Sequence, residues 1–398
     1  MTRSPAWWGL GVTLAIQSMV SMALLTLPVM APEATRALGA SPGLLGVYVA
    51  LAYLGAMGAS LAAGAATARY GAIRISQIGL LLCGLGLLLS AVPVLPVMGL
   101  GAWLIGLGYG PITPASSHLL ARSTPPAQMA LVFSIKQTGV PLGGLVAGAL
   151  VPMTALWLGW QGALLSVAGL CLLCALGAQG LRTEFDADRQ RQLPLAMGDL
   201  LSPVRLVLGQ RALSLLALCS FFFSIIQLSL TTYLVTYLHE TQAYSLVTAG
   251  LALSVAQAAG VVGRIAWGWV ADRFLGARRT LITLAGLMVL GCVSVACLQP
   301  SMGWWLVGPA LWVFGSSAIG WNGVYLSEVA RQAPPGQASV ATGGTLAITF
   351  LGVVLGPALF GAIASASGSF RLGYALLAVP ALVCAGVLWA RPATPRPT

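Results

Sequence analysis

Long apolar runs dominate the chain, and short clusters of charged residues, glycine and proline separate them. Each run reaches about 20 residues, the length of α-helix that crosses the hydrocarbon core of a bilayer. The pattern predicts twelve membrane spans, at residues 6–28, 44–66, 73–93, 96–118, 128–151, 159–180, 213–236, 247–270, 279–298, 303–326, 338–364 and 371–390. No small-residue cleavage site follows the first run, so we expect it to be retained rather than removed as a signal peptide.

A charged segment, residues 181–212, divides the spans into two sets of six. It carries nine charged residues and is predicted to be a cytoplasmic linker, with a short interfacial helix near MGDLLSPVRLVL. The two sets repeat each other, since HLLARSTPPAQ at 118–128 aligns with YLSEVARQAPPGQ at 325–337, an offset of 209 residues. Such repeats are typical of transporters. We therefore predict an all-α membrane protein with two pseudo-symmetric six-helix bundles, at 1–180 and 213–398, the second ending in a short cytoplasmic tail.

Composition supports this class. The chain is 58% hydrophobic and only 7% charged, with a mean hydropathy of +0.92, whereas about a quarter of a soluble domain is charged. Fifteen of the nineteen Lys and Arg residues fall in the linker, the tails and alternate loops, and this bias predicts that both termini are cytoplasmic. We expect a multi-pass protein of the cytoplasmic (inner) membrane. Topology also explains the net charge of +11, so nucleic acid is not expected as a partner.

One loop motif suggests a family. The segment GWVADRFLGARR at 268–279 resembles the cytoplasmic signature between the second and third helices of each half in the major facilitator superfamily, with one extra residue before its second glycine. The resemblance implies inner-gate roles for Gly268, Asp272, Arg273, Arg278, Arg279 and, in the first-half copy GAATARYGAIR, Arg69. That copy has Ala68 where the family favours aspartate. We expect Asp272 to lie near an arginine or a helix amino terminus, and the contact around Ala68 to be missing or weaker.

Two cations are predicted at membrane depth. Lys136, the only lysine in the chain, lies about 15 Å above the Pro125-Pro126 turn, and Arg264 lies about 12 Å above Asp272. An ionisable group at this depth is costly and normally serves function. Because no Asp or Glu occupies a comparable position, the two cations are interpreted as an anion-binding site. The structural alternatives are a Lys136 that snorkels or pairs with helix carbonyls, and an Arg264 that pairs with Asp272 or loop carbonyls.

Uncharged polar residues within or near the spans complete the candidate substrate site. They are Gln17, Gln227, Gln137, Gln257, Asn322, Tyr53 and Tyr325. Each of them is about as consistent with ordinary hydrogen bonding between helices. Gln17 and Gln227 are the stronger candidates, because they occupy matching places in the first helix of each half.

Arg264, four residues before Gly268, is also similar to the substrate arginine of the monocarboxylate and oxalate–formate carriers of the superfamily. The predicted function is therefore secondary transport of a small organic anion, most simply a carboxylate, driven by protons or by solute exchange. GVPLGG at 139–144 partly resembles a drug–proton antiporter motif, so proton-coupled efflux of hydrophobic or cationic compounds stays open, as does a non-transporting sensor. The sequence contains no nucleotide-binding loop, catalytic grouping or metal cluster. We expect no enzyme activity, no cofactor and no metal, and a monomer.

Overall fold

The computed structural model describes residues 5–41, 43–123, 135–187, 189–190, 192, 202–300, 302–334 and 338–390. Within these residues the regular structure is helical and includes no β-strand. The start of the predicted span 128–151, part of the linker and the tail 391–398 lie outside the described residues. The predicted all-α fold class is confirmed.

The first half is built from α1 (Pro5–Leu38), α2 (Gly43–Tyr70), α3 (Ala72–Ser90), α4 (Leu95–Tyr109), α5 (Ile112–Ser123) and α7 (Gly139–Gly177). α4 and α5 together form one span. α7 contains two spans, because Gly159 within it has a φ of 69° that breaks the helix, a conformation that glycine adopts readily. The chain then continues through η2 (Ala178–Leu181) and α8 (Arg182–Phe185) into the linker.

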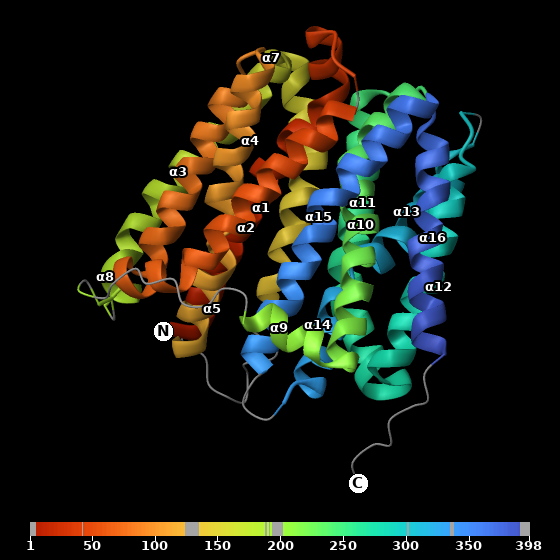
Figure 1. Ribbon diagram of the computed structural model, residues 1–398. Coiled ribbons are helices and arrows are strands. Elements are labelled where there is room, and N and C mark those ends of the chain that lie inside the picture. Colours follow the sequence, from red (N-terminus) through yellow and green to blue (C-terminus); the bar gives the residue numbers. More distant parts are fainter. Residues whose placement is uncertain are drawn as a thin grey trace.

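The second half follows α9 (Ser202–Gly209), a short helix in the region where an interfacial helix is predicted. Its elements are α10 (Arg211–Glu240), α11 (Leu246–Val270), η3 (Ala271–Leu275), α12 (Gly276–Ala296), α13 (Trp304–Ala318), α14 (Asn322–Gln332), α15 (Ala338–Ser367) and α16 (Phe370–Trp389). Figure 1 shows this bundle, coloured green to blue, beside the first bundle, coloured red to yellow.

The helices account for the predicted spans. In the described part of the chain, nine helical stretches are long and apolar enough to cross a membrane. Two of these stretches, 135–185 and 246–296, each contain two predicted spans, and the remaining span consists of α13 and α14. The twelve-helix prediction is therefore confirmed. An even number of spans places the two ends of the chain on the same side of the membrane.

Both bundles interrupt their fourth span near its middle. The first break, at 110–111, and the second, at 319–321, are related by the repeat offset of 209 residues. Proline has no N–H, so Pro114 cannot bond the carbonyl of Gly110, and Ser60 Oγ donates to that carbonyl instead, at 3.0 Å. Interrupted helices of this kind expose main-chain polar groups at membrane depth, as in many transporter sites.

The ends of the two bundles that lie away from α8 and α9, here named the outer ends, pack closely against each other. A Cβ on Gly46 of α2 would collide with the carbonyl of Pro357 in α15, and one on Gly148 of α7 would meet Ser254 Oγ of α11 at 2.7 Å. Ser254 Oγ also donates to the carbonyl of Leu145, at 2.8 Å. Backbones approach this closely only where side chains are small. The halves are therefore closed against each other at their outer ends.

Candidate functional site

Lys136 is fully enclosed by protein. It lies just before α7, its exposed fraction is 1%, and Nζ has no hydrogen-bond partner in the described part of the chain. A lysine that snorkelled to the interface would be exposed, and one that paired with helix carbonyls would have an acceptor. Neither structural alternative fits these observations. Burying an ammonium group without a partner is costly, so the position calls for a further explanation.

Arg264 connects the second half to the segment that contains Lys136. From α11, its Nη1 donates to the carbonyl of Gln137 at 2.7 Å, and its Nε donates to the carbonyl of Ile319 at 3.2 Å. The first bond crosses between the halves and reaches the residue next to Lys136. The two cations are also close enough to repel each other electrostatically. Arg264 binds carbonyls, as one alternative expected, but these carbonyls lie just before α7 and in the break between α13 and α14 rather than in the inner loop.

Three further groups of the first half adjoin these cations. Gln17 of α1 is buried and accepts a hydrogen bond from Thr113 Oγ1 of α5 at 3.1 Å, while its Nε2 has no partner within the described residues. Its side chain lies against Gly139, one turn after Lys136, where a Cβ would meet it at 2.9 Å. Tyr109 of α4 is near enough to Arg264 for an electrostatic interaction. We call Lys136, Arg264, Gln17, Thr113 and Tyr109 the central cluster.

Tyr53 of α2 borders this cluster. Its ring meets that of Tyr109 edge to face, with the centroids 6.1 Å apart. Tyr53 is therefore connected to Arg264 through Tyr109, and its role in substrate binding stays a prediction.

The second half contains a matching amide group. Gln227 Oε1 of α10 accepts hydrogen bonds from Trp321 Nε1 at 2.9 Å and from Asn322 Nδ2 at 3.4 Å. Because an indole N–H can only donate, Trp321 fixes the amide orientation, with the NH₂ of Gln227 directed elsewhere. This group adjoins the central cluster through Ile319, whose carbonyl binds Arg264.

The glutamine contacts obey the internal repeat. Thr113 binds Gln17 in the first half, and Asn322 binds Gln227 in the second. Gln227 follows Gln17 by 210 residues and Asn322 follows Thr113 by 209, so the two pairs are related by the repeat offset to within one residue. Each partner starts the second part of an interrupted fourth span. The same polar contact therefore occurs on the two sides of the inter-half interface.

Other predicted site residues lie further from the cations. Gln257 is buried against Gly144, where α11 packs on α7, about 10 Å further out than Arg264 along its helix. Tyr325 is packed inside the second half, with its ring 5.2 Å from that of Trp321. Gln137 contributes its carbonyl to Arg264 rather than a side-chain contact. The structure does not bring these three side chains into the central cluster.

The inner loop of the second half accommodates its extra residue as a π-helical turn. This turn, η3, contains Asp272, and a π-turn is a one-residue insertion in a helix. Gly276 follows with a φ of 73°, which explains the second glycine of the motif. A Cβ added at Gly268 would have no atom within 4 Å, so packing does not require a glycine there. Arg278 donates to the carbonyl of Leu388 at 2.9 and 2.7 Å and so caps α16.

The remaining predicted gate residues are on the surface. Asp272, Arg273 and Arg279 are exposed, and no ion pair joins Asp272 to any described residue. Arg69 of the first half lies over the ring of Tyr70, with Cζ 5.4 Å from the ring centre. The outer ends are closed in this conformation, so it does not test the contact that we expect Asp272 to make when the inner side closes.

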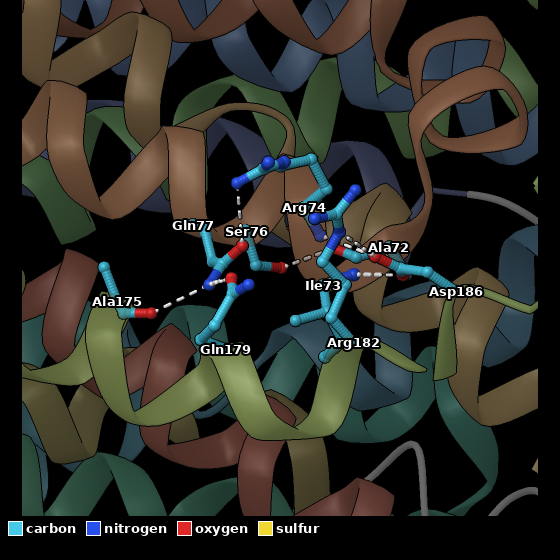
Figure 2. A network of polar contacts seen from close by, with 9 residues as sticks. All are labelled: Ala72, Ile73, Arg74, Ser76, Gln77, Ala175, Gln179, Arg182 and Asp186. Carbon is cyan, nitrogen blue, oxygen red and sulfur yellow. Dashed lines mark hydrogen bonds and ion pairs between the residues drawn. The ribbon is translucent and has the colours of Figure 1, made fainter. Parts of the chain in front are cut away.

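The first half obtains an acidic residue from the linker. Figure 2 shows Asp186 at the start of α3, where its two carboxylate oxygens accept from the main-chain N–H groups of Ile73 at 2.8 Å and Arg74 at 3.0 Å. Gly71 has a φ of 98°, and a Cβ there would collide with the Asp186 carboxyl group. Arg182 lies 3.8 Å from the same carboxylate. Burial raises the pKa of Asp186, and the two N–H donors and Arg182 oppose this effect.

Contacts of two kinds lie beside this cap: Gln77 of α3 binds α7 and η2, and the linker binds the loop through its main chain. Gln77 Nε2 donates to the carbonyl of Ala175 and to Gln179 Oε1, both at 2.9 Å (Figure 2), and the N–H of Gln190 donates to the carbonyl of Ala68 at 2.8 Å. The expected missing or weaker gate contact around Ala68 concerns the state in which the inner side is closed, so it stays a prediction. Within the first half, Asp186 supplies a carboxylate to the start of α3 from outside the motif.

Replacing Asp186 by alanine is expected to loosen this attachment. Two N–H groups at the start of α3 would lose their acceptor, at a cost of about 0.5–2 kcal/mol, and asparagine should cost less because it keeps one acceptor oxygen. Tryptic cleavage after Arg182 and Arg189 measures the release of the linker. The matched control is Glu184→Ala, an exposed acidic residue in the same short helix. Equal cleavage in Asp186→Ala and wild type would contradict the assignment.

Sequence reasoning missed Tyr109, Thr113 and Asp186. Adding the repeat offset to Thr113 gives Asn322, a residue already in the predicted site, so this signal was available. Tyr109 is an aromatic residue in a glycine-rich helix, and nothing in its local sequence links it to Arg264. Asp186 is one of several linker acids, and only folding selects it for the start of α3.

Comparisons with known proteins identify the fold and the family. The sequence profile of the Major Facilitator Superfamily matches residues 10–347. A solved structure of the nucleoside transporter NupG aligns over 96% of this chain and 98% of its own, with a TM-score of 0.77 and 16% identity. This similarity concerns the fold alone.

Two relatives are transporters of low identity. A probable hexose phosphate transport protein of Chlamydia trachomatis is 23% identical over 67% of this chain and 65% of its own length. A gentisate transporter of Corynebacterium glutamicum is 24% identical over 73% of this chain and 65% of its own length. The chain thus matches slightly less than two thirds of the length of either relative. The superfamily profile, in contrast, covers most of the chain and agrees with the twelve-helix fold, and the protein belongs to the Major Facilitator Superfamily.

Proposed function

We propose that this protein is a secondary transporter that moves a small organic anion across the membrane by alternating access of its two halves, 1–180 and 213–398. The observation that carries the proposal is that Arg264 binds the carbonyl next to Lys136 across the inter-half interface, while Lys136 Nζ is buried without a hydrogen-bond partner among the described residues. Two like charges repel each other, and an anion between them would relieve that repulsion.

The distribution of acidic residues supports this reading. The chain has eight Asp and Glu residues, and none lies within a span near the cations. Four are in the linker, Glu33 and Glu240 are toward the outer ends of α1 and α10, Asp272 is in η3, and Glu328 binds Arg331 at 2.9 Å. A cationic substrate would therefore meet two repulsive charges and no attractive one, which disfavours efflux of cations.

The relatives support the same class of substrate only coarsely. The names of the two proteins describe a phosphate ester and an aromatic carboxylate, and both of these are organic anions. Because each chain contains both halves of the interface, a monomer is sufficient for transport. We further propose that a proton gradient or solute exchange drives transport, since the sequence has no nucleotide-binding loop.

Uptake into proteoliposomes tests the proposal. A panel of radiolabelled monocarboxylates, dicarboxylates and phosphate esters is compared with cationic and neutral lipophilic compounds, in protein-containing and protein-free liposomes. We expect uptake and counterflow of at least one anion, and no transport of cations. Transport of lipophilic cations alone would favour the efflux alternative. Binding of an anion without flux, in either direction of the gradient, would favour the sensor alternative.

The proposed orientation gives a separate prediction. If both termini are cytoplasmic, residues 181–212 face the cytoplasm, and the linker is cut by trypsin in inside-out but not in right-side-out vesicles. The many arginines of this segment supply the cleavage sites. Cleavage only from the outside would refute the orientation, and the fold assignment would be unaffected.

A further inference from the structure

The central cluster contains two buried hydrogen-bond donors that bind no described residue. Both glutamine oxygens already accept hydrogen bonds, that of Gln17 from Thr113 and that of Gln227 from Trp321 and Asn322. The Nε2 of Gln17 is buried and unpaired within the described residues, and so is the Nζ of Lys136. An ammonium has three donors and no acceptor. A ligand that supplies acceptor atoms would therefore pair with both of these buried donors.

No acidic residue in the described part of the chain forms an ion pair with either cation of the site. Lys136 and Arg264 contribute two positive charges, and the acidic residues of the chain lie in the linker, at helix ends or, for Glu328, in an ion pair with Arg331. Arg264 retains N–H groups beyond the two that bind Ile319 and Gln137, because a guanidinium has five. A ligand with one negative charge would leave one buried positive charge uncompensated, whereas a ligand with two would neutralise both.

We propose that the transported anion is a dianion, such as a dicarboxylate or a phosphate monoester, and that Lys136 is the counter-charge for its second negative charge. This inference rests on the proposed function, and it narrows the substrate from organic anions in general to those with two charges. The observation that carries it is a buried ammonium that has no hydrogen-bond partner among the described residues, next to the Gln137 carbonyl that Arg264 binds. A protein built for a monoanion would need only one of the two cations, and it would avoid the cost of burying the other.

The test uses pairs of probes that differ in charge but share a carbon skeleton. The pairs are succinate and monomethyl succinate, phthalate and monomethyl phthalate, and glucose 6-phosphate and glucuronate, so that dicarboxylates and phosphate esters are examined separately. Binding to the purified protein is measured by equilibrium dialysis at pH 7.5. In the wild type we expect one dianion, at least, to bind ten times more tightly than its partner, which is about 1.4 kcal/mol.

Substitution of Lys136 tests whether this residue pairs with the second negative charge of the dianion. In Lys136→Gln we expect the ratio between the dianion and its monoanionic partner to fall to about one, chiefly through weaker binding of the dianion. Lys136→Met repeats the measurement if the glutamine variant does not fold, as judged by gel filtration and thermal unfolding. Arg36→Gln, the same loss of charge at an exposed outer position, is the control and should keep the wild-type ratio.

The outcomes separate this inference from the function on which it rests. Monoanions that bind to the wild type as tightly as their dianionic partners would overturn the inference and leave anion transport intact. A dianion preference that persists in Lys136→Gln and Lys136→Met would overturn the role of Lys136. If no anion of any pair binds to folded wild-type protein, both the inference and the proposed function fail.

Discussion

Lys136→Gln is expected to weaken binding of the transported anion by about 5- to 150-fold. Two opposite charges 4 Å apart attract each other by about 4 kcal/mol at an effective dielectric constant of about 20. Desolvation of the ammonium and of the anion offsets part of this attraction, which leaves a net loss of about 1–3 kcal/mol. Binding of the anion found in the uptake panel, measured on folded protein, checks the prediction.

Lys136→Arg should also impair transport, although it keeps the charge. Lys136 is enclosed on all sides, and the broader, planar guanidinium cannot occupy the same space as a compact ammonium. A lysine that served only to anchor a helix would show the opposite behaviour, with arginine tolerated and glutamine neutral for affinity. Wild-type affinity in Lys136→Gln would therefore defeat the assignment of Lys136 to the anion site.

Gly46→Ala is expected to shift the protein from the conformation with closed outer ends toward the one in which they separate. The added Cβ would collide with the Pro357 carbonyl and lie 2.7 Å from the Tyr233 hydroxyl. Overpacking of this kind costs about 1–3 kcal/mol, and the backbone of α15 cannot move aside without opening the interface. The ratio of closed to open forms should thus fall by about 5- to 150-fold, and transport should slow accordingly.

Spin labels at Ser41 and Ser367, both exposed near the outer ends of α2 and α15, measure this shift by pulsed dipolar spectroscopy. Exposed Cys297 is first replaced by serine so that it takes no label. Gly58→Ala is the matched control, since it lies on the same helix and a Cβ there meets no atom. A distance distribution in Gly46→Ala that matches the control would show that this contact does not hold the outer ends together.

The spans were predictable because a bilayer requires a long apolar helix regardless of which neighbours it packs against. Details within the spans depended on single residues. The extra residue before Gly276 was visible in the motif, but only the structure shows that a π-helical turn absorbs it. Gly159 likewise breaks α7 between two predicted spans, and its sequence context does not specify the φ of 69° that produces the break.

Within the candidate site, only the charged residues could be singled out from the sequence, because a charge in a membrane has a high free-energy cost. Lys136 and Arg264 were candidates for this reason, and Arg264 binds the carbonyl next to Lys136 across the halves. Tyr325 and Gln257 were chosen by the same reasoning from polarity, yet they pack away from the cations. Polarity alone does not tell which face of a helix meets a site and which meets a neighbouring helix. For neutral residues that choice depends on packing, which a single sequence does not record.

The attachment of Asp186 to α3 determines where the polypeptide can be divided. If the protein were produced as two separate pieces, a first piece ending at Gly180 would lack the carboxylate that caps Ile73 and Arg74 and the N–H that binds Ala68. A first piece ending at Gln192 would keep all of these contacts. Two-piece complementation should therefore succeed with the later division and be weaker with the earlier one. In this respect Asp186 and Gln190 of the linker belong with the first bundle.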